Sequence, residues 1–220
     1  MSIRFSKGCV LSAAVLLLGT VALAQDPSSS GTPVQSPSPS TSTPAKPPTV
    51  AQRKENQQDR IANGVKSGQL TAGETANLES KEAAINGETR ADHAANGGKL
   101  TQSEKQQINK QQNQLSKQIY TDKHNANTAH YGNNEVGQRR ENQQDRIAQG
   151  IKSGQLTAGE TAKLENQQRG INQQLKADRT DNGGKLTPGE KKQINKEQNA
   201  ASKNIYNKKH NAKTQGTTKK

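Results

Sequence analysis

The sequence predicts an all-α protein made of two tandem three-helix modules, which are joined internally by short Gly-Leu-Thr turns and preceded by a disordered linker. An internal duplication is the first observation: residues 55–126 align without a gap with residues 141–212, and 48 of the 72 positions are identical. We call these the first and second copy, and each residue of the first corresponds to the residue 86 positions later. Aliphatic residues recur at helical spacing within each copy. A repeated phrase, Gly-x-Leu-Thr-x-x-Glu, separates the helices and begins at Gly68, Gly98, Gly154 and Gly184.

The composition limits what such a chain can build. Only 27% of it is hydrophobic and 2% aromatic, which is too little apolar material for a large globular core. The net charge of +13 is spread unevenly along the chain. Residues 137–216 carry 16 Lys and Arg against 8 Asp and Glu, whereas residues 51–130 carry 11 against 9. The second half is therefore the basic half.

The N-terminal residues 1–24 have the pattern of a signal peptide. A basic start with Arg4 and Lys7 precedes an apolar run at 10–18, and small residues at 22–24 offer a cleavage site. The apolar run is too short to span a membrane. We therefore expect a secreted or periplasmic bacterial protein with no transmembrane segment after cleavage, and an uncleaved anchor is the alternative.

The remaining segments follow in order. Residues 25–50 are rich in Ser, Thr and Pro and nearly uncharged, so they are predicted to be a disordered linker. Helical module 1 covers residues 51–126, a second linker covers 127–137, and helical module 2 covers 138–213. A basic tail, 214–220, ends the chain. Because the modules contain few apolar residues, disorder of the whole isolated chain is the alternative.

Module 1 divides into three predicted helices. They run from about Gln52 to Lys66, from Ala72 to Ala94 and from Gln102 to His124. Their apolar positions form a narrow stripe like that of a coiled-coil seam. The nine aliphatic side chains expected in this core are Ile61, Val65, Leu70, Leu78, Ile85, Leu100, Ile108, Leu115 and Ile119.

The repeated phrase has the pattern of a helix stop followed by a helix start. Thr71 and Glu74 have capping-box spacing, in which each side chain accepts a hydrogen bond from an unpaired backbone N–H of the other residue. Gly68 suits a left-handed cap at the end of the preceding helix. Pro188 suits the first position of a helix, where no N–H is needed. The other phrases repeat this pattern at Thr101 and Glu104, Thr157 and Glu160, and Thr187 and Glu190.

The same phrase resembles the second half of an EF-hand loop. Gly98, Leu100 and Glu104 fall at the sixth, eighth and twelfth positions of that motif. The chain thus resembles the degenerate EF-hand-like GxLTxxE repeats of bacterial secreted proteins, and the resemblance implies weak calcium binding. The front half departs from the motif, since the first ligand position before Gly98 is His93. The metal ligands that the resemblance implies are Glu74, Glu104, Glu160, Glu190 and Asp181.

A second resemblance is to periplasmic chaperones made of helical hairpins, which carry Leu-Thr-x-x-Gln phrases. In this chain Glu replaces the final Gln. The resemblance implies that amphipathic helices bind a client protein. A chaperone-like role is therefore one alternative function, and a calcium-binding protein is another.

A tyrosine and a histidine four residues apart recur in both copies, as Tyr120 with His124 and Tyr206 with His210. A general base beside a phenol is one interpretation. The simpler one is a histidine near the C-terminal end of a helix, beside a tyrosine that covers the core. We therefore predict no catalytic residue and no enzyme.

The basic second copy predicts a noncatalytic binding or envelope-interaction protein. Lys192, Lys196 and Lys203 are spaced by four and seven, so they line one side of a helix. Such a surface attracts a polyanion or a component of the cell envelope. The chain is only 2% aromatic, so few rings are available to stack on bases, and the sequence does not predict sequence-specific nucleic-acid binding. The sequence does not predict an oligomeric state either. The polyanion-binding candidates are Arg139, Arg140, Lys192, Lys196, Lys203, Lys208 and Lys209.

Overall fold

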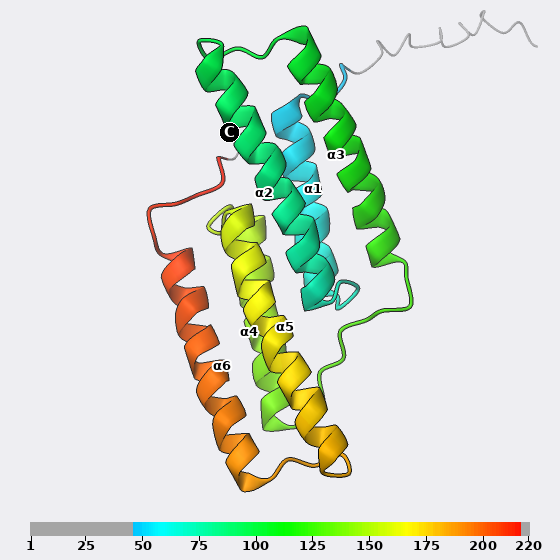
Figure 1. Cartoon of the computed structure of the whole chain (residues 1–220), viewed down its shortest axis with the longest axis vertical. Helices are drawn as coiled ribbons and strands as arrows, with labels where there is room; N and C mark the ends of the chain where they lie inside the picture. The colour runs from blue at the N-terminus through cyan, green and yellow to red at the C-terminus, as the bar shows by residue number, and fades with distance from the viewer. Residues whose placement is uncertain (1–45, 217–220) are drawn as a thin grey trace, which may run out of the picture. The chain divides into compact units, whose positions relative to one another are not determined.

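The computed structural model describes residues 46–216, and in this range the chain is all-helical, with six helices and no strand (Figure 1). The predicted signal peptide, most of the predicted linker and the last four residues lie outside the described range. Among residues 46–216, no helix combines the length and apolar character that a membrane span requires. The helices are α1 (Val50–Lys66), α2 (Ala72–Ala95), α3 (Gln102–Lys123), α4 (Glu135–Lys152), α5 (Ala158–Asp181) and α6 (Pro188–Lys209).

Two helices begin earlier than predicted, because α4 starts inside the predicted linker 127–137 and α1 starts at the last residue of the predicted linker 25–50. Helix α1 begins at Val50 rather than Gln52, because Thr49 and Gln52 form a capping box that was not predicted. Helix α4 begins at Glu135, where the Asn134 side chain accepts a hydrogen bond of 3.0 Å from the backbone N–H of Gly137. Helices α2 and α3 end within one residue of the prediction.

All four predicted capping boxes are confirmed. At the start of α2, the Glu74 carboxylate accepts a 2.9 Å hydrogen bond from the Thr71 backbone N–H, and the Thr71 hydroxyl accepts one of 3.3 Å from the Glu74 N–H. The predicted left-handed glycines are confirmed as well, since Gly68 has a φ of +71°. Positive φ angles also occur at Gly97, Gly98, Gly154, Gly183 and Gly184.

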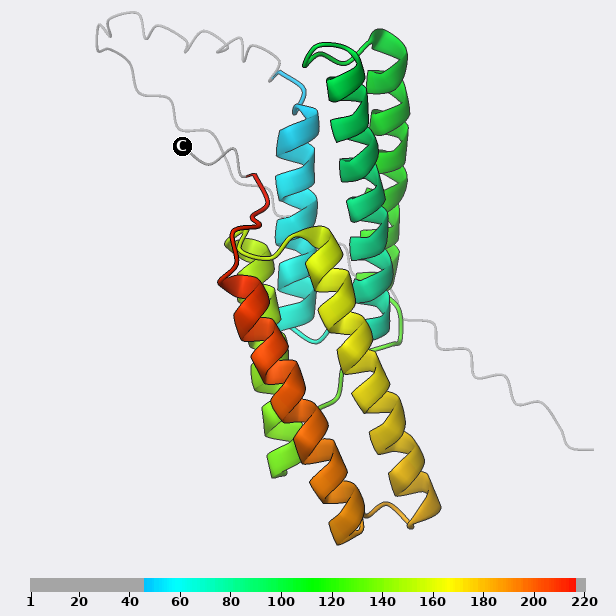
Figure 2. The ribbon, with the colours of Figure 1, turned by 60° about the vertical axis from the view of Figure 1, so that its left-hand side comes forward.

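The two copies pack against each other along their first two helices. Helix α2 runs antiparallel to α5, and α1 runs antiparallel to α4 (Figures 1 and 2). Helix α3 packs on α1 and α2, while α6 packs on α4 and α5. The four helices α1, α2, α4 and α5 therefore form the centre of this body, and α3 and α6 flank it.

Contacts between α2 and α5 obey an approximate two-fold symmetry. A Cβ atom built at Gly73 would lie 3.3 Å from Cδ of Arg169, and one built at Gly159 would lie 3.9 Å from Cβ of Ala83. Both residues of the second contact correspond to those of the first, so exchanging the copies maps one contact onto the other. Leu78 and its counterpart Leu164 lie midway between the contacts along their helices. The symmetry axis therefore passes near these two leucines.

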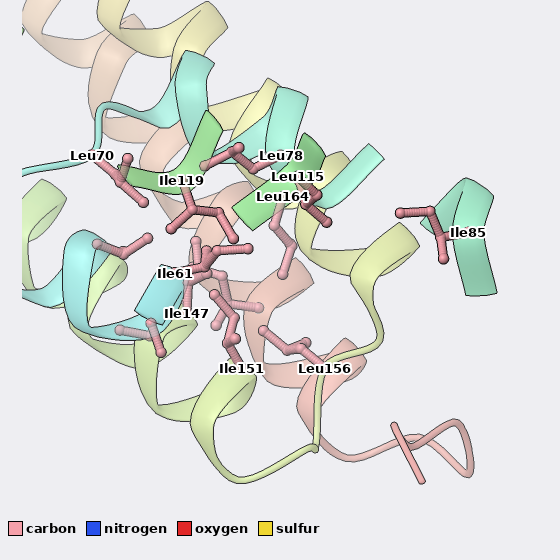
Figure 3. Close-up of a cluster of buried hydrophobic side chains, with 14 of the residues drawn as sticks. Ile61, Leu70, Leu78, Ile85, Leu115, Ile119, Ile147, Ile151, Leu156 and Leu164 are labelled. Carbon is pink, nitrogen blue, oxygen red and sulfur yellow. The ribbon is translucent and has the colours of Figure 1, made fainter. Parts of the chain in front are cut away.

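The main hydrophobic core is shared by both copies. It joins Ile61 and Leu78 of the first copy to Ile147 and Leu164 of the second (Figure 3). Eight of the nine aliphatic residues predicted for the first copy are buried, whereas Leu100 is half-buried at its edge. The core is thus broader than the stripe predicted from a single module, because six of its fifteen buried residues come from the second copy.

A smaller cluster lies among α4, α5 and α6 alone, where the two copies differ in side-chain size. Leu175 stands where the first copy has Thr89, and Ala201 stands where it has Leu115. Both are buried in this cluster, so the larger side chain on α5 compensates for the smaller one on α6.

Buried glutamines connect the helices within each copy. The side-chain amide of Gln57 donates to the Gln112 carbonyl at 2.7 Å and to Oγ of Ser116 at 2.9 Å. Gln143 makes the corresponding bonds in the second copy, at 2.7 and 2.8 Å. Because the N–H groups of these amides are paired, polar side chains fill interior space that a chain poor in apolar residues would otherwise leave empty.

Gly64 should not tolerate a larger side chain, although it lies within a helix. A Cβ atom there would approach Cγ and Cδ1 of Leu70 to 2.7 Å. We expect Gly64→Ala to lower the free energy of unfolding by about 1–3 kcal/mol through this overlap. In contrast, Gly87 has no atom within 4 Å of such a Cβ. Gly87→Ala should therefore stabilise by about 0.5–1 kcal/mol through helix propensity.

Urea unfolding followed by circular dichroism measures both changes. Equal stabilisation by the two alanines would contradict the close packing of α1 against Leu70.

Candidate functional site

Two of the predicted metal ligands, Glu74 and Glu160, lie in the first turn of a helix and accept hydrogen bonds from residues that follow the end of another helix. Besides its capping bonds, Glu74 accepts hydrogen bonds through Oε1 from the side-chain amides of Asn125, at 2.7 Å, and Asn127, at 3.1 Å. Glu160 similarly accepts one of 2.6 Å from Asn211. Burial tends to raise the pKa of both carboxyls, but these hydrogen bonds and those of the caps outweigh it, so each pKa is lowered.

Glu104 and Glu190 hold more exposed helix starts. Each accepts a hydrogen bond from the backbone N–H of its threonine, which lowers the pKa, and others from the amide of Asn96 or Asn182 at 2.8–3.0 Å. Asp181 is the last residue of α5. In the described part of the chain, no three His, Cys, Asp or Glu side chains come together to hold a metal ion. Each of the four glutamates closes a cap, and weak calcium binding stays a prediction.

The paired tyrosine and histidine stack at the ends of α3 and α6. The Tyr120 and His124 rings are 4.2 Å apart, and the Tyr206 and His210 rings repeat this geometry. Nδ1 of His124 lies 2.7 Å from the Tyr120 carbonyl, which can only accept, so this nitrogen carries the proton. Tyr120 is 62% exposed, so the expectation that it covers the core is wrong. In each copy the stacked rings instead lie at the C-terminal end of the helix, with the tyrosine exposed to solvent.

Three adjoining grooves surround the turn between α5 and α6. The first has a volume of about 470 Å³, the second about 390 Å³ and the third about 750 Å³. The first and second share Arg179, and the second and third share Lys191, so the grooves form a continuous surface. We call the cations that line it the basic belt: Arg140, Lys176, Arg179, Lys185, Lys191, Lys192 and Lys196.

The belt has little negative charge of its own. Glu135 is the only carboxylate among the described residues that line the three grooves, and it pairs with Lys191 at 3.1 Å. Lys185, Lys192 and Lys196 are exposed, so their charges face solvent. An anion that enters this surface would therefore meet mostly positive charge.

Arg140 lines the first groove and packs over Tyr131. Its guanidinium carbon lies 5.2 Å from the centre of the Tyr131 ring, which is a cation–π geometry. Burial lowers the pKa of this arginine and raises that of Tyr131. The Nε of Arg140 and the Oδ1 of Asn172 are buried without a hydrogen-bond partner, and both residues line the first groove. The Nε–H of Arg140 is therefore a hydrogen-bond donor of the belt that no acceptor in the described part of the chain pairs with.

The belt contains only part of the predicted polyanion site. Arg140, Lys192 and Lys196 belong to it. Arg139 donates hydrogen bonds to Asn195 and Asn199, so it holds α4 against α6 beside the third groove. The remaining candidates, Lys203, Lys208 and Lys209, lie on later turns of α6 outside the three grooves.

Lys176, Arg179 and Lys185 were not predicted as part of the site. They lie on α5 and its following turn, whereas the predicted residues lie on α4 and α6.

The first copy provides a comparison for the belt. At two belt positions it has a residue without a permanent charge, because His93 corresponds to Arg179 and Gln106 to Lys192. The other five positions are basic in both copies. The residues 86 positions earlier are Lys54, which directly precedes the first copy, and Arg90, Lys99, Lys105 and Lys110. The belt is therefore a stronger version of a charge pattern that both copies carry.

The fold and the belt define an all-helical protein with a concentrated basic surface at one end of its second copy. Comparisons with protein-family models, with curated proteins and with solved structures find no match to this chain.

Proposed function

We propose that this chain is a noncatalytic, exported binding protein whose two tandem three-helix modules present the basic belt to a polyanion, such as an anionic polymer of the cell envelope. The observation that carries the proposal is the belt itself: among residues 46–216, seven cations line three adjoining grooves, and the one carboxylate there is already paired.

Continuity of the belt favours a polymer over a small anion. A single phosphate or sulfate needs only two or three donors, whereas adjoining grooves can hold several successive anionic groups. Lysine and arginine contacts to phosphate or sulfate carry no sequence information by themselves. Binding should therefore depend strongly on salt and little on polymer sequence.

The double variant Arg179→His with Lys192→Gln tests this proposal, because it gives the belt the residues of the first copy. Using fluorescent duplex DNA only as a polyanion of known charge, we expect the slope of log affinity against log salt to become less steep by about 1–2. The measurement is fluorescence anisotropy of the full chain over a range of salt concentrations.

A matched control removes two charges outside the belt. Lys163→Asn with Arg169→Ala also introduces first-copy residues and changes the net charge equally near neutral pH. The control should keep the original slope. If the slope of log affinity against log salt becomes less steep by the same amount in both double variants, net charge alone attracts the polymer and the belt is not its site.

A further inference from the structure

A separate groove lies between the two copies and has a volume of about 800 Å³. The first copy contributes the start of α1 and the second half of α2. The second copy contributes the first residues of α5 and the segment 212–216. None of its lining residues belongs to the basic belt.

The lining combines apolar and cationic side chains. Ile85 and Ala158 are buried residues of its apolar part, while Lys54, Arg90 and Lys213 supply positive charge. Among the described residues that line this groove there is no aspartate or glutamate. Gln112 also lines it, and although its amide group donates to the Val50 carbonyl at 2.9 Å, its buried Oε1 has no partner.

Local substitutions explain why this groove is open. On the symmetry-related side, Arg169 extends over the start of α2 near Gly73, and the Tyr131 ring covers Arg140. On the open side the counterparts of the two arginines are Ala83 and Lys54, and both line the groove. The groove on the symmetry-related side is the first groove of the basic belt, since its lining residues Arg140, Asn172 and Lys176 correspond to Lys54, Asn86 and Arg90. It is smaller, with a volume of about 470 Å³.

We propose that the open groove binds an organic anion with an apolar body, of the class of aliphatic carboxylates. The cations Lys54, Arg90 and Lys213 fit its carboxylate, and the apolar lining around Ile85 and Ala158 fits its chain. The volume lies in the range of roughly 300–1,000 Å³ that is usual for small-molecule sites. A fully hydrated polyanion would leave the apolar lining unused. The proposal uses different residues from the belt and does not depend on it.

The test is calorimetric titration of the full chain with dodecanoate below its micelle concentration. Ala83→Arg introduces the arginine that extends over the helix start in the related, smaller groove, so we expect at least a tenfold loss of affinity. Attraction by charge alone predicts the opposite, because this variant adds a cation. The control Arg169→Ala leaves the open groove unchanged and should bind dodecanoate at least as well as the original chain.

Arg90→Ala gives a second test that does not alter packing, since Arg90 is exposed. We expect it to weaken dodecanoate binding at least threefold. The absence of heat with the original chain would overturn the proposal. So would unchanged or tighter binding by Ala83→Arg, or unchanged binding by Arg90→Ala.

Discussion

Replacing Glu82 with glutamine is expected to stabilise the protein at pH 8 by on the order of 2–3 kcal/mol. Glu82 is fully buried, and within the described part of the chain both of its carboxylate oxygens lack a hydrogen-bond partner. In the second copy its counterpart Gln168 donates an amide hydrogen to Oε1 of Gln143 at 3.1 Å. The corresponding oxygen of Gln57 is unpaired. A glutamine at position 82 can supply the missing donor, and so can a protonated Glu82.

Three buried glutamates make the stability depend on pH. Burial raises the pKa of Glu82 to about 7 and that of Glu165 to about 8, from an ordinary value of 4.5. Burial also raises the pKa of Glu79 well above this value. The positive charge of Lys54 offsets part of the rise in the pKa of Glu82. The negative charges of Glu82 and Glu165 raise the pKa of Glu79 further. The folded state therefore binds more protons than the unfolded state between about pH 4.5 and 8.

The free energy of unfolding should accordingly fall as pH rises through this window. Below it the trend should reverse, because Glu74 and Glu160 have lowered pKa values and their capping contribution is lost on protonation. We expect maximal stability near the lower end, at about pH 4.5–5.

Urea unfolding of the original chain and of Glu82→Gln from pH 4 to pH 9 measures this dependence. The variant should lose less stability between pH 4.5 and 8 than the original chain. The reciprocal change Gln168→Glu is the matched control, and it should add a loss at high pH. If Glu82→Gln and the original chain follow parallel curves, Glu82 does not retain its proton in the folded state.

Replacing Leu164 with alanine should lower the free energy of unfolding by about 2–5 kcal/mol, as is usual for a large buried side chain. Leu164 is only 2% exposed and belongs to the core cluster that includes Ile61 and Leu78 of the first copy. Its loss should therefore destabilise both copies. Hydrogen exchange followed by mass spectrometry should detect reduced protection in α1 as well as in α4.

Ile194→Ala is the comparison, because Ile194 lies in the cluster confined to α4, α5 and α6. This variant should reduce protection mainly in α5 and α6. Unchanged protection of α1 in Leu164→Ala would mean that the two copies unfold independently.

Local structure was well predicted because its signals are local. Capping residues, left-handed glycines and helical spacing all act within a few residues, and the sequence displays them directly. Contacts between the copies could not be predicted, since no local signal sets the register of α2 against α5. The predicted core was narrow for this reason, and also because it contained only aliphatic residues, whereas Gln57 and Gln112 are buried as well.

One sequence signal for the interface was available. Leu78 and Glu79 are identical in the second copy, as Leu164 and Glu165, although most residues from 80 to 90 differ. A charged residue retained beside a core leucine in a variable stretch could have indicated a buried carboxyl.

The basic belt was only half predicted for a similar reason. Counting charges along α6 found Lys192 and Lys196, but the belt forms where the end of α5 folds back beside α6. This turn brings Arg179 and Lys185 to the same surface.

The most direct test of the proposed function is to locate the bound polyanion by nuclear magnetic resonance. Titration of the ¹⁵N-labelled full chain with a heparin tetrasaccharide should shift the amide signals of the basic belt, above all those at Lys176, Arg179, Lys185 and Lys191. The corresponding first-copy residues should shift less at the same concentration. Equal shifts in both copies, or shifts concentrated at Lys203, Lys208 and Lys209, would contradict the belt as the binding site.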